Sequence, residues 1–301
     1  MKNLLIAGLL MAFQCSAALS APNWTVYHFN YGNLDQPQPQ QTADLYLLNK
    51  GINPAVVFIH GGAWETGDKS AYAGYYAQLY AVAGFHVLAI NYRLATSDLA
   101  TQWNAQLQDV QLAIRWLRQY ASILRIDPAR IGAAGDSAGG HLALFLGSLD
   151  ASVPNSTCGR YCFFNQSPKV SAVVDMFGPA DLTQPAIYSW VQNLLLLNKT
   201  TYNPKNPDIV KVYQSASPIF VVSNQTAPTC IVQGITDTVV PLSQSIELRN
   251  KLASSGVPYK WIPFYGGHGF SGVPSWLKMI IDTEALMCIS GYLHPNPFNA
   301  F

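Results

Sequence analysis

The stretch Gly135-Asp136-Ser137-Ala138-Gly139 decides the fold of this 301-residue chain. It follows a short apolar run at 130–134 and precedes a helical pattern of apolar residues at 138–149. A strand that ends in G-x-S-x-G and turns directly into a helix is a nucleophile elbow, in which small neighbours let strand and helix approach closely. We therefore predict that Ser137 Oγ projects from the carboxyl end of a sheet, while the Ala138 N–H at the helix N-terminus faces an oxyanion. For the motif alone, an ordinary Gly/Ser loop entering a helix is the alternative.

A second glycine-rich loop follows the run of buried apolar residues at 55–59. It reads His60-Gly61-Gly62-Ala63-Trp64. Glycines directly after a buried strand leave backbone N–H groups open to a ligand, so Gly62 and Ala63 are the predicted second half of the oxyanion hole. A plain strand-to-helix connection is the alternative here. We expect His60 to fix the loop by hydrogen bonds and not to act as the base.

Strands and helices alternate along the chain, which predicts right-handed crossovers and a mostly parallel, twisted sheet flanked by helices, an α/β fold. Near-continuous apolar runs indicate strands that are buried on both faces, and apolar spacings of three and four indicate amphipathic helices. The expected strands are 24–29, 42–47, 55–59, 85–90, 130–134, 170–176, 229–233 and 259–264, and the expected helices are 68–83, 103–117, 138–149, 243–254 and 274–289.

Two polar residues follow later strands and complete a candidate constellation with Ser137. Asp237 lies in the loop after 229–233, and His268 lies between glycines in the loop after 259–264. The order nucleophile, acid, base along the chain, with each residue just after a strand, is that of an α/β-hydrolase triad. Taken alone, Asp237 is equally well a surface-turn residue. Asp136, beside the predicted nucleophile, is interpreted as structural.

No internal repeat or long linker divides the chain, so residues 21–301 are predicted to form one α/β-hydrolase domain. Residues 182–226, which are rich in prolines and aromatics, are a candidate lid or substrate-shaping insertion and not a large cap. Ordinary packing of helices on the core explains each aromatic there equally well.

Residues 1–20 have the pattern of a secretory signal peptide: Lys2, an apolar run at 4–13, and the small-residue site Ala18-Leu19-Ser20. The apolar run is too short for a membrane span, and the residues before Cys15 make a poor lipoprotein signal. We therefore expect an exported protein, extracellular or periplasmic, without a stable membrane anchor.

The chain is half hydrophobic, 11% charged, and has a formal net charge of +1. This balance, without a cluster of Lys and Arg, argues against nucleic acid as a partner. No pattern in the sequence specifies an oligomeric state.

Four cysteines follow the predicted leader, and an oxidising compartment would allow two disulfides in three connectivities. Proximity favours Cys158–Cys162, with Cys230–Cys288 as the complement. A buried free thiol at Cys230 is the alternative, and zinc is weaker because no second pair of ligands has the required spacing.

The motifs resemble those of α/β-hydrolase esterases in the hormone-sensitive-lipase-like superfamily. The subgroup that is most similar includes bifunctional acetylxylan/feruloyl esterases and relatives of kynurenine formamidase. The resemblance spans residues 53–290, with two departures: Ala63 stands where a third glycine is usual, and Gln233 where His is common. It rests on residues 60–64, 67–69, 91–94, 135–142, 234–241 and 267–270.

The resemblance implies a serine carboxylesterase with Ser137 as nucleophile, Asp237 as acid and His268 as base. The oxyanion donors would be Ala138 with Gly62 and Ala63, and no metal or organic cofactor is needed. The implied substrates are small or polysaccharide-linked esters with short-chain or aromatic acyl groups. An amidase or formamidase with the same triad is the alternative, and a non-catalytic binding protein on this fold is a weaker one.

Overall fold

The structure, a computed structural model, describes residues 24–149, 153–154, 158–185, 187, 191 and 202–294. The predicted signal peptide, residues 1–20, lies outside the described residues. No helix in the described ranges is both long and apolar enough to cross a bilayer.

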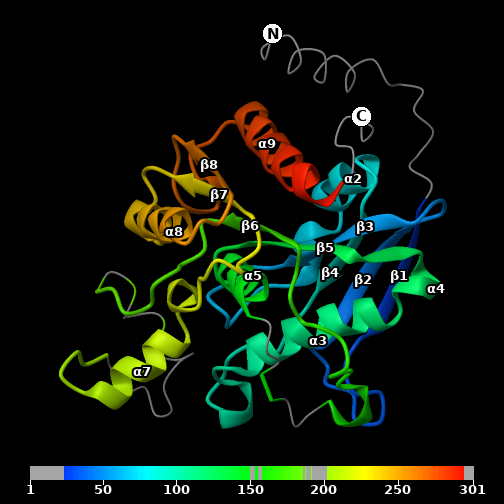
Figure 1. Ribbon diagram of the computed structural model, residues 1–301, viewed down its shortest axis with the longest axis horizontal. Helices are drawn as coiled ribbons and strands as arrows, with labels where there is room; N and C mark the ends of the chain where they lie inside the picture. Colours follow the sequence, from blue (N-terminus) through cyan, green and yellow to red (C-terminus); the bar gives the residue numbers. More distant parts are fainter. Residues whose placement is uncertain are drawn as a thin grey trace.

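One twisted sheet of eight strands forms the middle layer, with helices on both of its faces (Figure 1). The strand order is β1-β2-β4-β3-β5-β6-β7-β8. Pairs β1–β2 and β2–β4 are antiparallel and all the others are parallel, which confirms the predicted mostly parallel sheet. The strands are β1 Trp24–Asn30, β2 Thr42–Leu48, β3 Asn53–Ile59, β4 His86–Ile90, β5 Ile126–Asp136, β6 Ala172–Met176, β7 Thr229–Gly234 and β8 Tyr259–Phe264.

The sheet separates two apolar core layers, each covered by helices. Apolar residues of α3, α5 and α8 pack on one face of the sheet, and those of α2 and α9 pack on the other (Figure 1). The strands between them are buried on both sides, which explains their near-continuous apolar sequences. The helices are α2 Tyr75–Val82, α3 Ala105–Gln119, α4 Ala121–Leu124, α5 Ala138–Ser148, α7 Pro207–Ser215, α8 Leu242–Ser254 and α9 Ser275–Leu293.

The helix predicted over 68–83 is wrong in its first half. A 3-10 turn, Lys69–Tyr72, comes first, and α2 begins only at Tyr75 after Gly74. The Asp68 carboxylate accepts from Ser70 N, and Asn91 Oδ1 accepts from Lys69 N at 2.6 Å. These bonds, together with the low helix propensity of glycine, explain the interruption.

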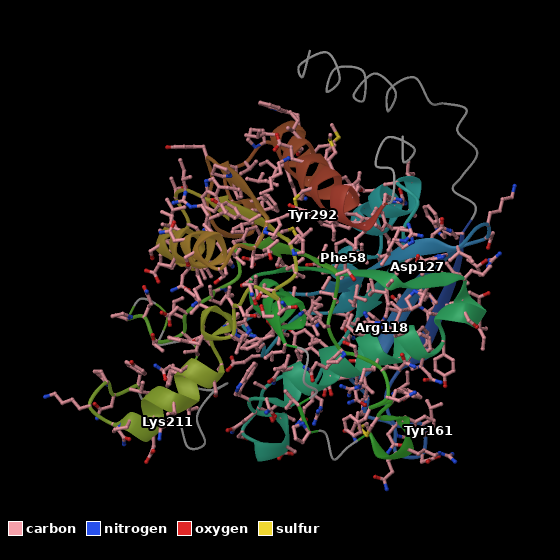
Figure 2. All side chains as sticks on the ribbon, in the orientation of Figure 1. Phe58, Arg118, Asp127, Tyr161, Lys211 and Tyr292 are labelled. Atoms are coloured by element: carbon pink, nitrogen blue, oxygen red, sulfur yellow. A yellow bond between two sulfur atoms is a disulfide. The ribbon has the colours of Figure 1, made fainter. Side chains whose placement is uncertain are left out.

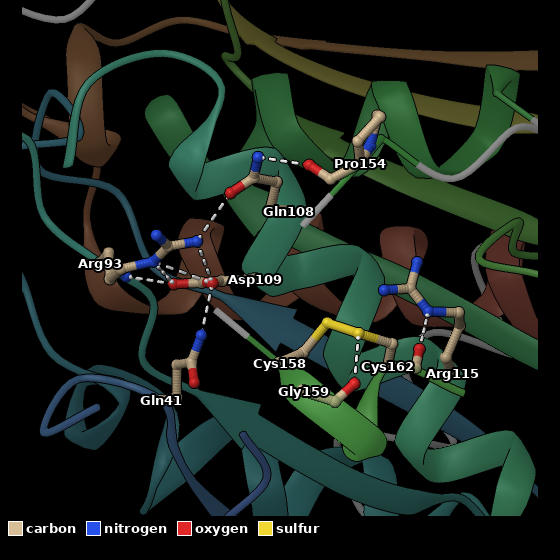
Figure 3. The surroundings of a disulfide bond; sticks show 9 residues. All are labelled: Gln41, Arg93, Gln108, Asp109, Arg115, Pro154, Cys158, Gly159 and Cys162. Carbon is tan, nitrogen blue, oxygen red and sulfur yellow. Dashed lines mark hydrogen bonds and ion pairs between the residues drawn. A yellow bond between two sulfur atoms is a disulfide. The ribbon is translucent and has the colours of Figure 1, made fainter. Parts of the chain in front are cut away.

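Both favoured disulfides are present. Cys158 and Cys162 join across a 3-10 turn with a Cα–Cα distance of 5.0 Å (Figure 3). Cys230 on β7 joins Cys288 on α9 at 6.2 Å, so a free thiol at Cys230 is wrong. The second bridge ties the sheet to its last helix.

The segment 182–226 is described only in part, because residues 186, 188–190 and 192–201 lie outside the described residues. Its helix α7 lies away from the sheet, and Lys211 projects from it (Figure 2). After α7, the segment contacts α5, the helix that follows Ser137: His141 Nε2 donates to Ala216 O at 2.8 Å. A lid role for this segment stays a prediction.

Candidate active site

Ser137 occupies the turn between β5 and α5 with a strained backbone of positive φ, φ 52° and ψ −118°. Its N–H donates to Met176 O at 2.8 Å on the neighbouring strand. A Cβ on Gly139 would lie 1.9 Å from Ile59 O, and one on Gly135 would lie 2.4 Å from the Gly139 carbonyl carbon. Only glycine fits at both positions, so close backbone packing imposes the strained turn.

The three predicted triad side chains lie within hydrogen-bond distance of one another. His268 Nε2 is 3.0 Å from Ser137 Oγ, and His268 Nδ1 is 2.8 Å from Asp237 Oδ2. A carboxylate only accepts hydrogen bonds, so we assign the Nδ1–H as donor to Asp237 and Nε2 as acceptor for the Ser137 hydroxyl. The fold therefore brings His268 together with Asp237, which is 31 positions away in sequence, and with Ser137, which is 131 positions away.

The Asp237 carboxylate is fully buried and firmly oriented. Its other oxygen, Oδ1, accepts from Val239 N at 2.8 Å and from Val240 N at 2.9 Å. The His268 side chain is 22% exposed, whereas that of Asp237 is 0% exposed. These backbone donors hold the carboxylate in place, and its bond to Nδ1 in turn fixes the ring orientation of His268.

Phe177, which the sequence analysis did not single out, supports the imidazole from the side. Its ring meets the His268 ring edge-on at 5.0 Å, directly after β6. Its backbone has a φ of 46°, which is uncommon for a bulky residue. The only feature of the sequence that could have identified Phe177 is its position just after a buried strand.

The predicted oxyanion loop has three successive residues with positive φ: 109° at Gly62, 51° at Ala63 and 62° at Trp64. Gly62 O accepts from Glu65 N at 3.0 Å and from Thr66 N at 2.9 Å, closing a tight turn. A Cβ on Gly62 would lie 2.2 Å from Thr66 O, so glycine is required there. Among the described residues, no protein atom accepts a hydrogen bond from the Gly62 or Ala63 N–H.

A pocket of about 490 Å³ opens over Ser137 and His268. Ala138, the other predicted donor, is fully buried as the first residue of α5 and is not among the described lining residues. Glu65 and Asp136 are the acidic residues of the described lining, and none of its described residues is Lys or Arg. The described lining consists of Gly62, Ala63, Glu65, Thr66, Asp136, Ser137, Val239 and His268.

Asp136 connects the elbow to the oxyanion loop. Its Oδ1 accepts from Gly61 N at 3.0 Å and from the hydroxyl of buried Tyr72. A Cβ on Gly61 would lie 2.5 Å from Asp136 Oδ2, so the contact needs glycine. This arrangement is that of a residue that holds the loop, which agrees with the structural interpretation of Asp136.

His60 lies behind the loop and not in the pocket. Its Nδ1–H donates to Gly61 O at 2.7 Å, and its ring stacks on Tyr92 at 4.4 Å. Burial lowers the pKa of His60, so the neutral ring prevails at neutral pH.

Asp175 is a buried carboxyl behind the elbow that the sequence analysis missed. Its Oδ1 accepts from Gly178 N at 2.9 Å, and a Cβ on Gly140 would lie 2.4 Å from the same oxygen. Burial raises the pKa of Asp175 to about 8. The acid is therefore mostly protonated at neutral pH. Its place inside an apolar strand gave no sign of this.

The described residues hold no group of three or more His, Cys, Asp and Glu side chains arranged to bind a metal ion. The chemistry that the pocket offers comes from a hydroxyl, an imidazole, carboxylates and backbone N–H groups.

Comparison with known proteins places these features in a family. The sequence profile of the family described as BD-FAE matches residues 43–252. The probable carboxylic ester hydrolase LipM of Mycobacterium tuberculosis is 29% identical over 237 residues, which cover 78% of this chain and 53% of LipM. An acetylxylan esterase of Xylanibacter ruminicola is 25% identical over 282 residues, covering 92% and 52%. The chain thus spans about half the length of these curated relatives.

Solved structures share the fold over nearly the whole chain. A truncated carbohydrate esterase from gut microbiota superposes with a TM-score of 0.68 at 28% identity, covering 89% of this chain and 98% of its own. Esterase Est2 of Thermogutta terrifontis superposes with a TM-score of 0.70 at 23% identity, covering 92% and 96%. The predicted α/β-hydrolase fold is confirmed.

Proposed function

Because this chain belongs to the BD-FAE family of α/β-hydrolases, we propose that it is a serine carboxylic ester hydrolase. The observation that carries the proposal is the hydrogen-bonded series from Ser137 through His268 to Asp237, at 3.0 and 2.8 Å, in which Ser137 and His268 line an open pocket and Asp237 is buried behind them. The names of the similar proteins support the same activity.

In the proposed reaction, the Ser137 oxygen attacks the ester carbonyl while His268 Nε2 takes its proton. Asp237 holds the imidazole tautomer and stabilises the imidazolium that forms. His268 then protonates the departing alcohol, which leaves an acyl group on Ser137. Water, deprotonated by the same imidazole, releases the acid and restores the hydroxyl.

The oxyanion formed in each step would accept hydrogen bonds from the N–H groups of Ala138 and of Gly62 or Ala63. Each such donor contributes about 3 kcal/mol to lowering the barrier in enzymes of this kind. Support comes from the strained backbone of the loop, which points N–H groups of Gly62 and Ala63 away from internal partners.

We propose esters with short or aromatic acyl groups, carried on plant polysaccharide, as the substrates. The acetylxylan esterase and the carbohydrate esterase among the similar proteins favour this class. The wall of the pocket suits it as well, because Glu65 and Thr66 offer acceptors for sugar hydroxyl groups.

We also propose that the protein is exported, with residues 1–20 removed as a signal peptide and residues 21–301 acting as one domain. The two disulfides favour an oxidising compartment. N-terminal sequencing of the protein recovered outside the cytoplasm should begin at Ala21. A start at Met1 would contradict processing.

Hydrolysis of p-nitrophenyl esters from acetate to palmitate, together with methyl ferulate, tests the proposed activity. We expect turnover to peak at acetate or butyrate and to be abolished in Ser137→Ala. A peak at long chains would indicate a lipase. Turnover of formanilide but of no ester would move the assignment to an amidase, and an absence of all turnover would favour a binding protein.

A further inference from the structure

The first turns of α2 and α9 meet on one face of the sheet, beside the loops that carry the predicted oxyanion donors and His268. Figure 1 shows the two helices on that same face. The side chains that join them come from segments about 200 residues apart in sequence: Tyr76 on α2 bonds to Asp282 and Lys278 on α9.

Lys278 occupies the centre of this contact. Its Nζ donates to Asp282 Oδ2 at 2.6 Å and to the Tyr76 hydroxyl at 2.9 Å. The ammonium also lies 4.9, 4.6 and 4.8 Å from the ring centroids of Tyr75, Tyr76 and Phe270. We call these four residues, Tyr75, Tyr76, Phe270 and Asp282, the lysine cage.

The cage holds the ammonium far more firmly than a surface ion pair does. The Asp282 side chain is 1% exposed and that of Lys278 is 32% exposed. Burial raises the pKa of Asp282, and the bonds from Lys278 and Tyr76 oppose this rise. Cation–π contacts with partly desolvated rings add further attraction. An uncompensated charge in this place would be costly, so the pair and its rings act as one unit.

One wall of the cage is part of the turn that carries His268. Phe270 ends the 3-10 turn His268–Phe270, in which both Gly269 and Phe270 have a φ of 63°. A bulky residue rarely adopts that φ because it is strained, so its side-chain contacts must hold the turn in place. Those contacts are the stacked ring of Phe264 at 5.0 Å, the edge of Phe177 at 5.3 Å, and Lys278.

Tyr76, the cage residue on α2, connects the cage to the elbow through Tyr72. The Tyr76 ring meets the Tyr72 ring at 5.3 Å, and the Tyr72 hydroxyl donates to Asp136 Oδ1. Both tyrosine rings also pack on Phe58, at 4.8 and 5.7 Å. Phe58 itself lies in the middle of the sheet layer (Figure 2). The lysine cage therefore lies between the support of the oxyanion loop and the turn of His268.

From this geometry we propose that Lys278 is a positioning residue: seated in the lysine cage, its ammonium holds Phe270, and thereby sets the distance of the His268 imidazole from Ser137. The effect on turnover rests on the proposed esterase function, whereas the effect on the His268 ring does not. Lys278 itself touches no reacting atom.

The test replaces Lys278 with Met, which keeps an unbranched side chain of nearly the same length and removes the charge. We expect kcat to fall about 10-fold with KM unchanged within twofold, because a small displacement of the base acts on the chemical step and not on binding. Rates are compared per fluorophosphonate-titrated site, well below the melting temperature. Lys278→Arg, which restores a cation over the rings, should recover most of the loss. Lys260→Met is the matched control, since it removes a lysine of an exposed pair with Glu284, and should leave kcat unchanged.

A second readout does not depend on turnover. The low-field proton resonance of the His268 Nδ1–H bonded to Asp237 should be sharp in the wild type and broadened or lost in Lys278→Met. Wild-type kcat and an unchanged resonance in a folded Lys278→Met variant would overturn the proposal, even if the melting temperature fell. If that variant does not fold, Tyr76→Phe removes the hydroxyl and keeps the ring, and the same pair of unchanged readings there would overturn it. If the wild type hydrolyses no ester but the resonance is still broadened or lost in Lys278→Met, the proposed function alone would be contradicted.

Discussion

The turn that presents Ser137 and the turn that presents His268 solve the same problem in different ways. Both hold residues at positive φ, 52° at Ser137 and 63° at Phe270. At the elbow, an added Cβ would collide with the backbone, because a Cβ on Gly139 would lie 1.9 Å from Ile59 O. In the His268 turn, a Cβ on Gly269 would meet nothing within 4 Å. The first turn is imposed by backbone packing, and the second depends on side chains brought from other elements.

The largest expected effect comes from adding one methyl group to the elbow. Gly139→Ala should lower the free energy of unfolding by at least about 3 kcal/mol and abolish activity, because backbone of β3 would have to move. Urea denaturation followed by circular dichroism measures this change. Gly291→Ala in α9 is the matched control: its Cβ meets nothing, and it should stabilise by about 0.5–1 kcal/mol. Equal changes in the free energy of unfolding for Gly139→Ala and Gly291→Ala would contradict the claim that backbone packing imposes the elbow.

A second effect concerns the protonated acid behind the elbow. The pKa of Asp175 is about 8 in the folded protein, against about 3.9 in the unfolded chain. Between these values the folded protein binds more protons than the unfolded chain, so stability should fall as the pH rises from about 4 to 8. Asp175→Asn should flatten this slope and gain a few kcal/mol over the wild type at pH 8 relative to pH 4.

Melting temperatures of both proteins, taken at intervals between pH 4 and pH 8, measure the slope. Parallel curves for the wild type and Asp175→Asn would show that Asp175 ionises normally inside the fold.

The smallest expected effect lies in the His268 turn. Gly269→Ala adds a methyl group in open space, so its cost is the φ of 63° alone, about 1 kcal/mol. We expect kcat to stay within about threefold of the wild type, measured with p-nitrophenyl acetate. A loss of stability as large as that of Gly139→Ala would mean that this turn, too, is fixed by its backbone.

The same contrast explains what the sequence could predict. The elbow and the oxyanion loop follow from short motifs after apolar strands, because backbone sterics restrict Gly139 and Gly62 to glycine. Asp237 and His268 followed from their positions just after later strands, in the chain order of an α/β-hydrolase triad. The buried strands were identified for a similar reason, since strands covered on both faces need continuous apolar residues. The two disulfides are the pairing that the proximity of Cys158 and Cys162 favoured among the three possible connectivities.

Contacts between distant side chains that no local motif marks were not predicted. Phe177 beside His268, Tyr72 bonded to Asp136, and the lysine cage each join residues that are far apart in sequence and of common types. The break before α2 escaped notice because Asn91, 22 residues away, accepts the hydrogen bond of Lys69 N that competes with the helix. Local pattern carries no record of such pairings.

The measurement that most directly tests the proposed serine mechanism is the mass of the protein after reaction with paraoxon. We expect one phosphoryl adduct on the wild type, located on the peptide that contains Ser137, and none on Ser137→Ala. The adduct should form much more slowly on His268→Ala, because the hydroxyl then lacks its base. An adduct that persists on Ser137→Ala, or a wild type that remains unmodified, would contradict the assignment of Ser137 as the nucleophile.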